Sequence, residues 1–308
     1  MKMERIDKER IVIIGASILD VLVRPADRNV FETGSSPAED ISISFGGDAL
    51  NEATVLAALG KKVQLQTLLG NDTEAKMIRD HCEKSGIELS TGKRNEEIKT
   101  GVNVVLIKEN GERSFLTNKN GSLRKLKAED IELPFPQDTG ILCFASIFVF
   151  PEIRNQELAK LFRAAKAQGI TICADMTKRK QGESVEGMKE SLAYIDFLIP
   201  NEEEACLLTG KESAELAANS LIEAGTGCVI IKCGSKGCYI RNREIAEYVP
   251  AVLVEKCVDT TGAGDSFAAG FIYGLSEGWE LKKCARYANS CGAKAVQVMG
   301  ATNWCNYL

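Results

Sequence analysis

The stretch D-T-T-G-A-G-D, residues 259–265, decides the fold of this 308-residue chain, because the apolar run S-F-A-A-G-F-I-Y-G-L follows it at once. The apolar run predicts a buried helix, and the polar stretch before it predicts the start of that helix. A helix N-terminus leaves backbone N–H groups unpaired and carries about half a positive charge, so it binds anions without a basic side chain. Gly262 and Gly264 remove side chains where a phosphate must approach, and Ala263 adds little bulk. The stretch therefore suits a phosphate-binding loop.

Asp265 is the unusual member of this stretch, because a phosphate ligand repels a neighbouring carboxylate. Its placement makes sense if it accepts a proton from a hydroxyl group that then attacks phosphorus. The plainer alternative is a capped helix start, with Asp259 or Thr260 as the cap and the glycines serving packing. Taken alone, so short a glycine motif favours that alternative.

Composition excludes several classes of partner. The formal net charge is -5, with 44% hydrophobic and 26% charged residues, the balance of an ordinary globular protein. A negative surface attracts neither nucleic acid nor an anionic membrane, so we expect no binding to either. No apolar stretch approaches the roughly 18 residues of a membrane helix, and the charged start does not resemble a signal peptide. The expected location is therefore cytoplasmic.

The eleven cysteines do not predict a metal site or disulfides. No two form C-x-x-C, and the chain has one histidine. Cys228, Cys233 and Cys238 are evenly spaced, but the first heads a predicted strand and the other two straddle a turn. Reduced, buried thiols are the better interpretation.

Apolar runs alternate with amphipathic stretches along most of the chain, which indicates a parallel sheet flanked by helices. Several helix candidates end at glycine. Right-handed crossovers then predict an α/β fold with a doubly wound, mostly parallel sheet between two helix layers. The predicted strands are 11–15, 63–70, 141–147, 170–175, 197–201 and 228–234, and the predicted helices are 47–59, 73–85, 155–168, 202–209 and 214–224.

Two segments break the alternation and predict a small separate sheet. Residues 99–107 and 112–118 read as strands joined by Glu109-Asn110-Gly111, and Asn-Gly between alternating strands favours a hairpin. Residues 19–24 and 41–45 read as two more short strands. We expect these four strands to form a lid over a site at the carboxyl ends of the core strands. A β extension without function is the alternative. The expected core is 1–15, 46–98 and 120–308, and the expected lid is 16–45 and 99–119.

Three motifs in order along the chain resemble the signatures of the ribokinase-like, or PfkB, family of carbohydrate kinases. These are F-G-G-D-A-L-N-E-A-T-V-L-A-A-L-G (45–60), P-N-E-E-E-A (200–205) and D-T-T-G-A-G-D-S-F-A-A-G-F (259–271). Shorter matches are G-A-S-I-L-D after the first strand, G-N-D at 70–72 and K-C-G-S-K-G at 232–237. The joint match is specific and covers nearly the whole chain.

The resemblance implies a role for each matching residue on the phosphate side. Asp265 matches the catalytic base, and the N–H groups of Gly262, Ala263 and Gly264 match the anion hole. Asn201 and Glu204 match the pair that organises Mg²⁺ and its waters. Their alternative is a helix cap followed by an acidic first turn, and N-E-E-E alone favours that alternative. For the nucleotide turn, usually T-x-G-x-x-G, the resemblance implies ATP contacts from Lys232, Gly234, Gly237 and Thr260, with lysine in place of threonine.

On the acceptor side, the resemblance makes Asp20 the carboxylate that grips two neighbouring sugar hydroxyls. Gly46 and Gly47 would let the sugar lie against bare backbone, and Asn51 would add a polar contact. Without the resemblance, the glycines are a loop before a helix and Asp20 is a surface carboxylate.

Two features of the match concern substrate and ions. Asp175-Met176-Thr177-Lys178-Arg179 retains the ends of the D-x-N-x-R motif of hexose and keto-acid kinases, so Asp175 and Arg179 are sugar-contact candidates. A plain loop with basic residues is their alternative. In some family members backbone carbonyls near the late glycine loop bind K⁺, and here these would lie around Asp259 and residues 293–301.

The resemblance implies an ATP- and Mg²⁺-dependent kinase that phosphorylates a primary hydroxyl of a small sugar such as fructose, 2-keto-3-deoxygluconate or ribose. A nucleoside kinase of the same family and a non-catalytic sugar sensor are the alternatives. An NAD-dependent dehydrogenase is disfavoured because I-G-A-S-I-L-D has one glycine where G-x-G-x-x-G is needed. A homodimer through the lid is a further expectation, because exposed strand edges invite pairing.

Overall fold

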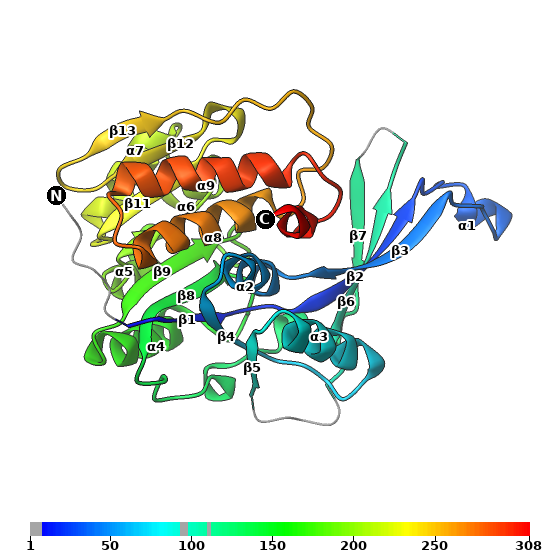
Figure 1. Cartoon of the computed structure of the whole chain (residues 1–308), viewed down its shortest axis with the longest axis horizontal. Coiled ribbons are helices and arrows are strands. Elements are labelled where there is room, and N and C mark those ends of the chain that lie inside the picture. Colours follow the sequence, from blue (N-terminus) through cyan, green and yellow to red (C-terminus); the bar gives the residue numbers. More distant parts are fainter. Residues whose placement is uncertain (1–7, 93–97, 110–111) are drawn as a thin grey trace.

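The computed structural model describes residues 8–92, 98–109 and 112–308 (Figure 1). Regular elements fill most of that range. The strands are β1 (Arg10–Ile14), β2 (Ile18–Arg24), β3 (Asp40–Gly46), β4 (Lys62–Thr67), β5 (Glu88–Thr91), β6 (Gly101–Ile107), β7 (Arg113–Thr117), β8 (Thr139–Ile147), β9 (Thr171–Met176), β10 (Phe197–Leu198), β11 (Cys228–Lys232), β12 (Cys238–Arg241) and β13 (Ala246–Val249). The α-helices are α1 (Val30–Thr33), α2 (Asp48–Ala58), α3 (Thr73–Lys84), α4 (Asn155–Ala167), α5 (Val185–Leu192), α6 (Glu202–Thr209), α7 (Ala214–Glu223), α8 (Ala263–Ser276) and α9 (Leu281–Ala295).

The main sheet has the order β13-β12-β11-β10-β9-β8-β1-β4-β5, and its strands are parallel from β11 through β5. The chain winds outward from β1 in both directions, so the sheet is doubly wound as predicted. The order reverses between β1 and its neighbour β8, and ligands of such sheets bind beside that point, at the carboxyl ends of the strands.

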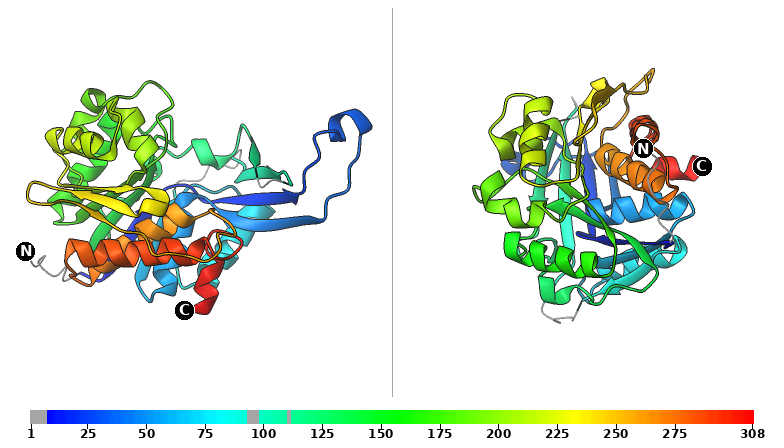
Figure 2. Two further views of the ribbon diagram at one scale, coloured as in Figure 1. Left: turned by 90° about the horizontal axis from the view of Figure 1, so that it is seen from above. Right: turned by 90° about the vertical axis from the view of Figure 1, so that its left-hand side faces the viewer.

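Helices cover both faces of this sheet (Figure 2). Side chains of β1 alternate between the two layers because successive strand residues point to opposite faces. Ile11 and Ile13 pack with residues of α2, α3, α8 and α9, whereas Val12 and Ile14 pack with residues of α4, α5 and α7. Two buried cores therefore hold the sheet from either side.

The lid is a separate four-stranded sheet with the order β3-β2-β6-β7. It projects from one end of the core, and both Figure 1 and Figure 2 show the β2–β3 ribbon as its long arm. The pairing of four strands from two insertions follows the prediction. The predicted turn residues Asn110 and Gly111 lie outside the described residues, and the proposed boundaries of core and lid stay a prediction.

Most predicted core elements are present within a few residues of their expected ends, and the predicted terminal glycines lie in the left-handed region, as Gly60 (φ 81°) and Gly210 (φ 68°) do. The sequence patterns did not single out β5, β12, β13, α5 and α9. The run 197–201 forms only the two-residue strand β10 before turning into α6. All eleven cysteines are free thiols, and most are buried.

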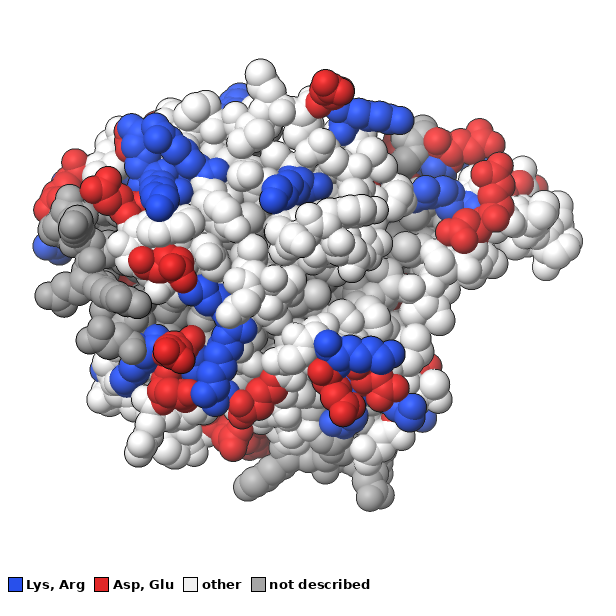
Figure 3. Space-filling view, viewed as in Figure 1, with Lys and Arg blue, Asp and Glu red and all other residues white. Residues whose placement is uncertain are grey.

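The described residues contain no helix long and apolar enough to cross a membrane. On the face shown in Figure 3, acidic and basic side chains are interspersed rather than gathered by sign. That face therefore offers an anion no broad patch of positive charge.

Close contact between α8 and α9 fixes the helix that carries the glycine motif. A Cβ on Gly270 would lie 2.8 Å from Cys291 Sγ and 3.1 Å from Ala288 Cα, and a Cβ on Gly274 would lie 3.0 Å from Cys284 Cα. These glycines let the two backbones approach, and the close contact fixes the position of α8 against α9.

We expect Gly270→Val to push α8 away from α9 and to lower the free energy of unfolding by about 1–3 kcal/mol. Gly187→Ala is a matched control, because Gly187 lies exposed in α5 at a negative φ, and a Cβ there would meet nothing closer than Ser184 Oγ at 3.4 Å. That control should stabilise the protein by about 0.5–1 kcal/mol. Urea unfolding of both variants measures the difference. Equal unfolding midpoints for Gly270→Val and wild type would contradict the close packing of α8 on α9.

Candidate active site

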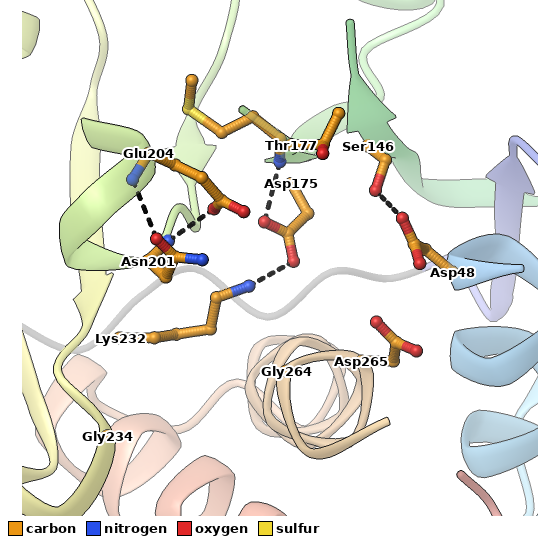
Figure 4. Close-up of a pocket in the computed structure, with 11 residues that line it drawn as sticks. Asp48, Ser146, Asp175, Thr177, Asn201, Glu204, Lys232, Gly234, Gly264 and Asp265 are labelled. Carbon is orange, nitrogen blue, oxygen red and sulfur yellow. Dashed lines mark hydrogen bonds and ion pairs between the residues drawn. The ribbon is translucent and has the colours of Figure 1, made fainter. Parts of the chain in front are cut away.

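A cavity of about 390 Å³ lies at the carboxyl ends of the core strands. Polar side chains reach it from β8, β9 and β11 and from the segment after β10, and the N-termini of α2, α6 and α8 complete it. Figure 4 shows these side chains turned toward a common space. The lining residues are Asp48, Ser146, Asp175, Met176, Thr177, Asn201, Glu204, Lys232, Gly234, Gly264 and Asp265.

The glycine stretch forms the N-terminus of α8, as predicted. Gly262 is the cap residue at φ 69°, and a Cβ there would lie 2.5 Å from Ala301 Cβ. Only glycine fits this left-handed, crowded position. Within the described residues, the N–H groups of Gly264 and Asp265 have no protein acceptor, whereas Ala263 N–H already donates to Thr260 O at 3.3 Å. The free amides at the cavity are thus those of Gly264 and Asp265.

Asp265 faces the cavity from the first turn of α8 (Figure 4). Its Oδ2 accepts a hydrogen bond from Asn51 Nδ2 at 2.6 Å. Burial raises the pKa of Asp265 to about 8, with the nearby Asp48 carboxylate adding to the rise. A carboxyl group with such a pKa exchanges its proton near neutral pH, where a general base is most effective.

Lys232 and Asp175 form an ion pair across the cavity wall. The lysine extends from the end of β11, and a Cβ on Gly264 would lie 3.6 Å from its Nζ. Burial lowers the Lys232 pKa, but the carboxylates of Asp175 and Glu204 outweigh burial and raise it. The ammonium group is therefore charged and lies beside the free amide of Gly264.

Asn201 and Glu204 form the capping box of α6. Asn201 Oδ1 accepts from Glu204 N at 2.8 Å, and Glu204 Oε2 accepts from Asn201 N at 2.8 Å. This is the structural alternative recognised from the sequence, yet both residues also line the cavity. Burial raises the pKa of Glu204 to about 7. The charge of Lys232 favours the ionised carboxylate but does not offset the effect of burial.

The predicted sugar residues lie together where the lid meets the core. Asp20 Oδ1, on β2, accepts from Asn103 Nδ2 at 3.0 Å, and a Cβ on Gly46 would lie 2.3 Å from Asp20 Oδ2. Gly47 has φ 92°, and a Cβ there would lie 2.4 Å from Ala16 O. Glycine is therefore required at position 47, and a side chain at position 46 would displace the Asp20 carboxylate. Asn51 follows one turn into α2 and joins this group to Asp265.

Three other predicted residues lie apart from the cavity lining. Gly237, at φ 98°, turns β11 into β12, and a Cβ there would lie 2.1 Å from Val249 O. Thr260 lines a second cavity, of about 540 Å³, between the lid and the glycine loop. Arg179 is exposed, and its Nη1 donates to Glu183 O within the same loop. The structure does not bring Arg179 to the cavity.

Sequence reasoning missed Asp48. This first residue of α2 lines the cavity, hydrogen bonds to Ser146 Oγ, and has its pKa raised to about 6 by burial and the nearby Asp175 carboxylate. Ser146, at φ 62°, is one of two non-glycine residues with positive φ among those described. The available signal was position, because Asp48 directly follows Gly46-Gly47 at a helix start.

The model of the pfkB family carbohydrate kinases matches residues 8–306. The chain belongs to this family. A cytidine kinase of Thermococcus kodakarensis is 28% identical over 282 residues, covering 90% of this chain and 92% of the relative. A 2-dehydro-3-deoxygluconokinase of Haemophilus influenzae is 26% identical, covering 88% and 92%. Ribokinase of Thermotoga maritima superposes with a TM-score of 0.79 at 25% identity, covering 96% and 95%.

The chain is thus an ATP-dependent sugar or nucleoside kinase of the pfkB family. ATP is the phosphoryl donor of the family, and Mg²⁺ generally accompanies it. Relatives of similar identity act on different acceptors, so identity alone does not choose the substrate.

The raised pKa of Asp265 predicts a pH dependence of stability. The folded protein retains this proton above pH 4, where the unfolded chain has lost it, so the stabilisation is present below about pH 4 and lost as pH rises through about 8. Asp265→Asn carries no charge and should melt at a higher temperature than wild type at pH 8, with a smaller advantage at pH 5. Ligand-free thermal unfolding at both pH values measures this, with Asp80→Asn, at a half-exposed carboxylate outside the cavity, as control. An advantage independent of pH would refute the assignment.

Proposed function

We propose that the protein transfers the γ-phosphoryl group of ATP to a primary hydroxyl of a small sugar, with Asp265 as the catalytic base. One observation carries this proposal. The Asp265 carboxylate lies in the cavity next to the free Gly264 N–H and is hydrogen bonded to Asn51, which belongs to the sugar side. A hydroxyl group placed between these groups would lie beside the Asp265 carboxylate, which accepts its proton, and beside the Gly264 N–H, which binds the phosphoryl group.

Sugar binding is assigned to Asp20, Gly46, Gly47 and Asn51. The two oxygens of Asp20 suit two neighbouring hydroxyls, and the Asn103 hydrogen bond fixes the carboxylate. The Cβ positions of the two glycines are occupied by Asp20 Oδ2 and by the Ala16 backbone, so these glycines bring the start of α2 close to that carboxylate. The primary hydroxyl then points past Asn51 toward Asp265.

Charge on the transferring group is met by the amides of Gly264 and Asp265 and by the ammonium group of Lys232. Preorganised donors of this kind stabilise charge that develops during transfer. Lys232 stands where the family motif has threonine, so this chain has a buried cation at that place. Gly234 has no atom within 4 Å of its Cβ position and would leave space for the nucleotide at the β11–β12 turn, while Gly237 shapes that turn and Thr260 would flank the nucleotide.

The oxygen atoms of Glu204 and Asn201 suit Mg²⁺, which prefers such ligands and retains several waters. No group of three or more His, Cys, Asp or Glu side chains in the described ranges is placed to hold a metal ion, so these two residues would contact the ion's waters rather than enclose it. When bound with ATP, Mg²⁺ supplies positive charge to the phosphate oxygens.

A nucleoside acceptor is the second candidate, because the cytidine kinase relative matches 90% of this chain. A ribonucleoside presents the same pair of neighbouring hydroxyls to Asp20. Asp175 is bound to Lys232 and Arg179 lies outside the cavity, so the D-x-N-x-R remnant gives no direct support for a keto-acid sugar. We retain both residues as candidates for contact with a larger acceptor.

The decisive variant is Asp265→Asn. It should fold, bind ATP as wild type does, and lose roughly 10²- to 10⁴-fold in turnover, because the proton of the attacking hydroxyl has no acceptor. In wild type, kcat/KM for the sugar should rise with pH up to about 8, the pKa to which burial raises Asp265. ADP release with Mg-ATP measures both, and turnover near the wild-type rate would remove Asp265 from the mechanism.

The same assay across sugars, keto-acid sugars and nucleosides identifies the acceptor. Faster turnover of a nucleoside than of any sugar would favour the second candidate. Sugar binding without ADP release across the whole panel would indicate a sensor instead of a kinase.

We also propose a homodimer through the lid. Its edge strands are β3 and β7, and the lid exposes Ile41, Ile43, Phe115 and Leu116. Exposed edges and apolar side chains of this kind are commonly covered by another chain. Light scattering after size-exclusion chromatography should give twice the 33.5 kDa chain mass, and Phe115→Glu should lower it. A wild-type monomer at micromolar concentration would contradict the dimer.

A further inference from the structure

One side chain of the lid reaches the loop that carries the glycine motif. Arg113 is the first residue of β7, where it pairs with Ile107, and its guanidinium group crosses to the core. Nη2 donates to Asp259 Oδ1, and Nη1 donates to Thr261 Oγ1. The side chain of Arg113 is 26% exposed and that of Asp259 is 4% exposed. This ion pair therefore joins lid and core away from bulk water.

Asp259 is the centre of the glycine loop's internal bonding. Its Oδ1 also accepts Thr261 N at 2.9 Å and Thr261 Oγ1 at 2.7 Å, and its Oδ2 accepts Gly300 N at 3.0 Å. Burial raises the pKa of Asp259, but the hydrogen bonds from Gly300, Thr261 and Arg113 outweigh burial and lower it. The carboxylate is charged, and Arg113 is its ion-pair partner among the described residues.

The K⁺ site implied by the family resemblance does not fit these residues. The Asp259 carboxylate already has a cation and three further donors. Five of the carbonyl oxygens within residues 293–301 already accept a hydrogen bond. Ala293 O accepts from Gln297 Nε2, Lys294 O from Gln297 N, Ala295 O from Val298 N, Val296 O from Val258 N, and Met299 O from Asn303 Nδ2.

The same guanidinium group also acts on the sugar side. Burial raises the pKa of Asp20, and the Asn103 hydrogen bond and the charge of Arg113 oppose that rise. Arg113 therefore lies between the carboxylate proposed to hold the sugar and the loop proposed to hold the phosphate. A lid displaced from the core would withdraw the cation from Asp259.

We propose that Arg113 is a positioning residue that supplies, from the lid, the positive charge holding Asp259 and the phosphate loop in place, so that catalysis needs no monovalent cation. This inference rests on the proposed function for its kinetic part only. Removing the guanidinium leaves a buried carboxylate without its partner, which is costly. A small cation from solution should then be able to take its place.

The test compares Arg113→Ala and Arg113→Lys with Arg24→Ala. Arg24 is the matched control, because it lines the same 540 Å³ cavity from the lid but, among the described residues, donates its side-chain hydrogen bonds to Met299 Sδ, at 3.7 and 3.8 Å, and forms no ion pair with Asp259. Each protein is studied with KCl, guanidinium chloride below denaturing concentration, or tetramethylammonium chloride, at constant ionic strength.

Without kinase activity, thermal unfolding tests the ion pair. K⁺ and guanidinium should raise the melting temperature of Arg113→Ala more than tetramethylammonium does, and should leave wild type and Arg24→Ala unchanged. With activity, Arg113→Ala should lose on the order of 10²-fold in kcat, as displacement of a catalytic loop does, and regain at least part of it with K⁺ or guanidinium. Arg113→Lys should retain more activity than Arg113→Ala.

Three results would overturn the proposal. These are wild-type activity that requires K⁺, an Arg113→Ala variant as active as wild type, and a loss of activity in Arg113→Ala that no cation relieves. If Arg113→Ala does not fold, Arg113→Gln combined with Asp259→Asn removes both charges and should fold. Failure of that double variant to exceed Arg113→Gln in melting temperature would equally refute the pairing. A wild-type protein inactive on every acceptor would refute the proposed function but leave the thermal test intact.

Discussion

The first turn of α8 is the constraint on which the site depends. Its amides must stay free to face an anion, so the turn has to be held by contacts other than its own hydrogen bonds. Those contacts are the packing of Gly262 on Ala301, the close packing of α8 on α9 at Gly270 and Gly274, and the hydrogen bond from Asn51 to Asp265. Each comes from a different part of the chain. The fold therefore serves to hold one short turn open toward the carboxyl ends of the strands.

That turn lies in a cavity with an unequal balance of charge. Four acidic residues line the cavity, namely Asp48, Asp175, Glu204 and Asp265. One basic residue, Lys232, stands among the described lining residues. Burial raises the pKa of all four carboxyl groups, and a cation entering the cavity would favour their charged forms. ATP brings more negative charge, and binding is favoured only if cations enter with it. The cavity's own composition thus argues for a metal-nucleotide complex as the ligand.

Local patterns and motifs in the sequence predicted the fold class and several of the candidate site residues. Alternating strands and helices indicated the doubly wound sheet. The motifs singled out Asp265 and Asn51, which the fold joins by a hydrogen bond, and Asp20, which lies on β2 of the lid. Patterns could not reveal pairings made only by folding. Arg113 and Asp259 lie 146 positions apart in the sequence. No feature of the stretch E-R-S-F distinguishes Arg113 from an exposed residue of the lid. Asp48 was missed for another reason, because an acidic residue at a helix start is ordinary on any surface. Arg179 kept its motif position, but the loop turned its guanidinium toward Glu183.

Placing the counter-charge of Asp259 on the lid has a consequence that a bound ion would not have. An ion from solution would hold the glycine loop whether or not the lid lay against the core. A guanidinium fixed to β7 holds it only when the lid is seated, and the same lid carries Asp20 on β2. Sugar contact and phosphate cradle then depend on one relative position of two sheets. Since water reaches an open site and could attack ATP, a cradle completed by the closed lid favours transfer to the sugar over hydrolysis.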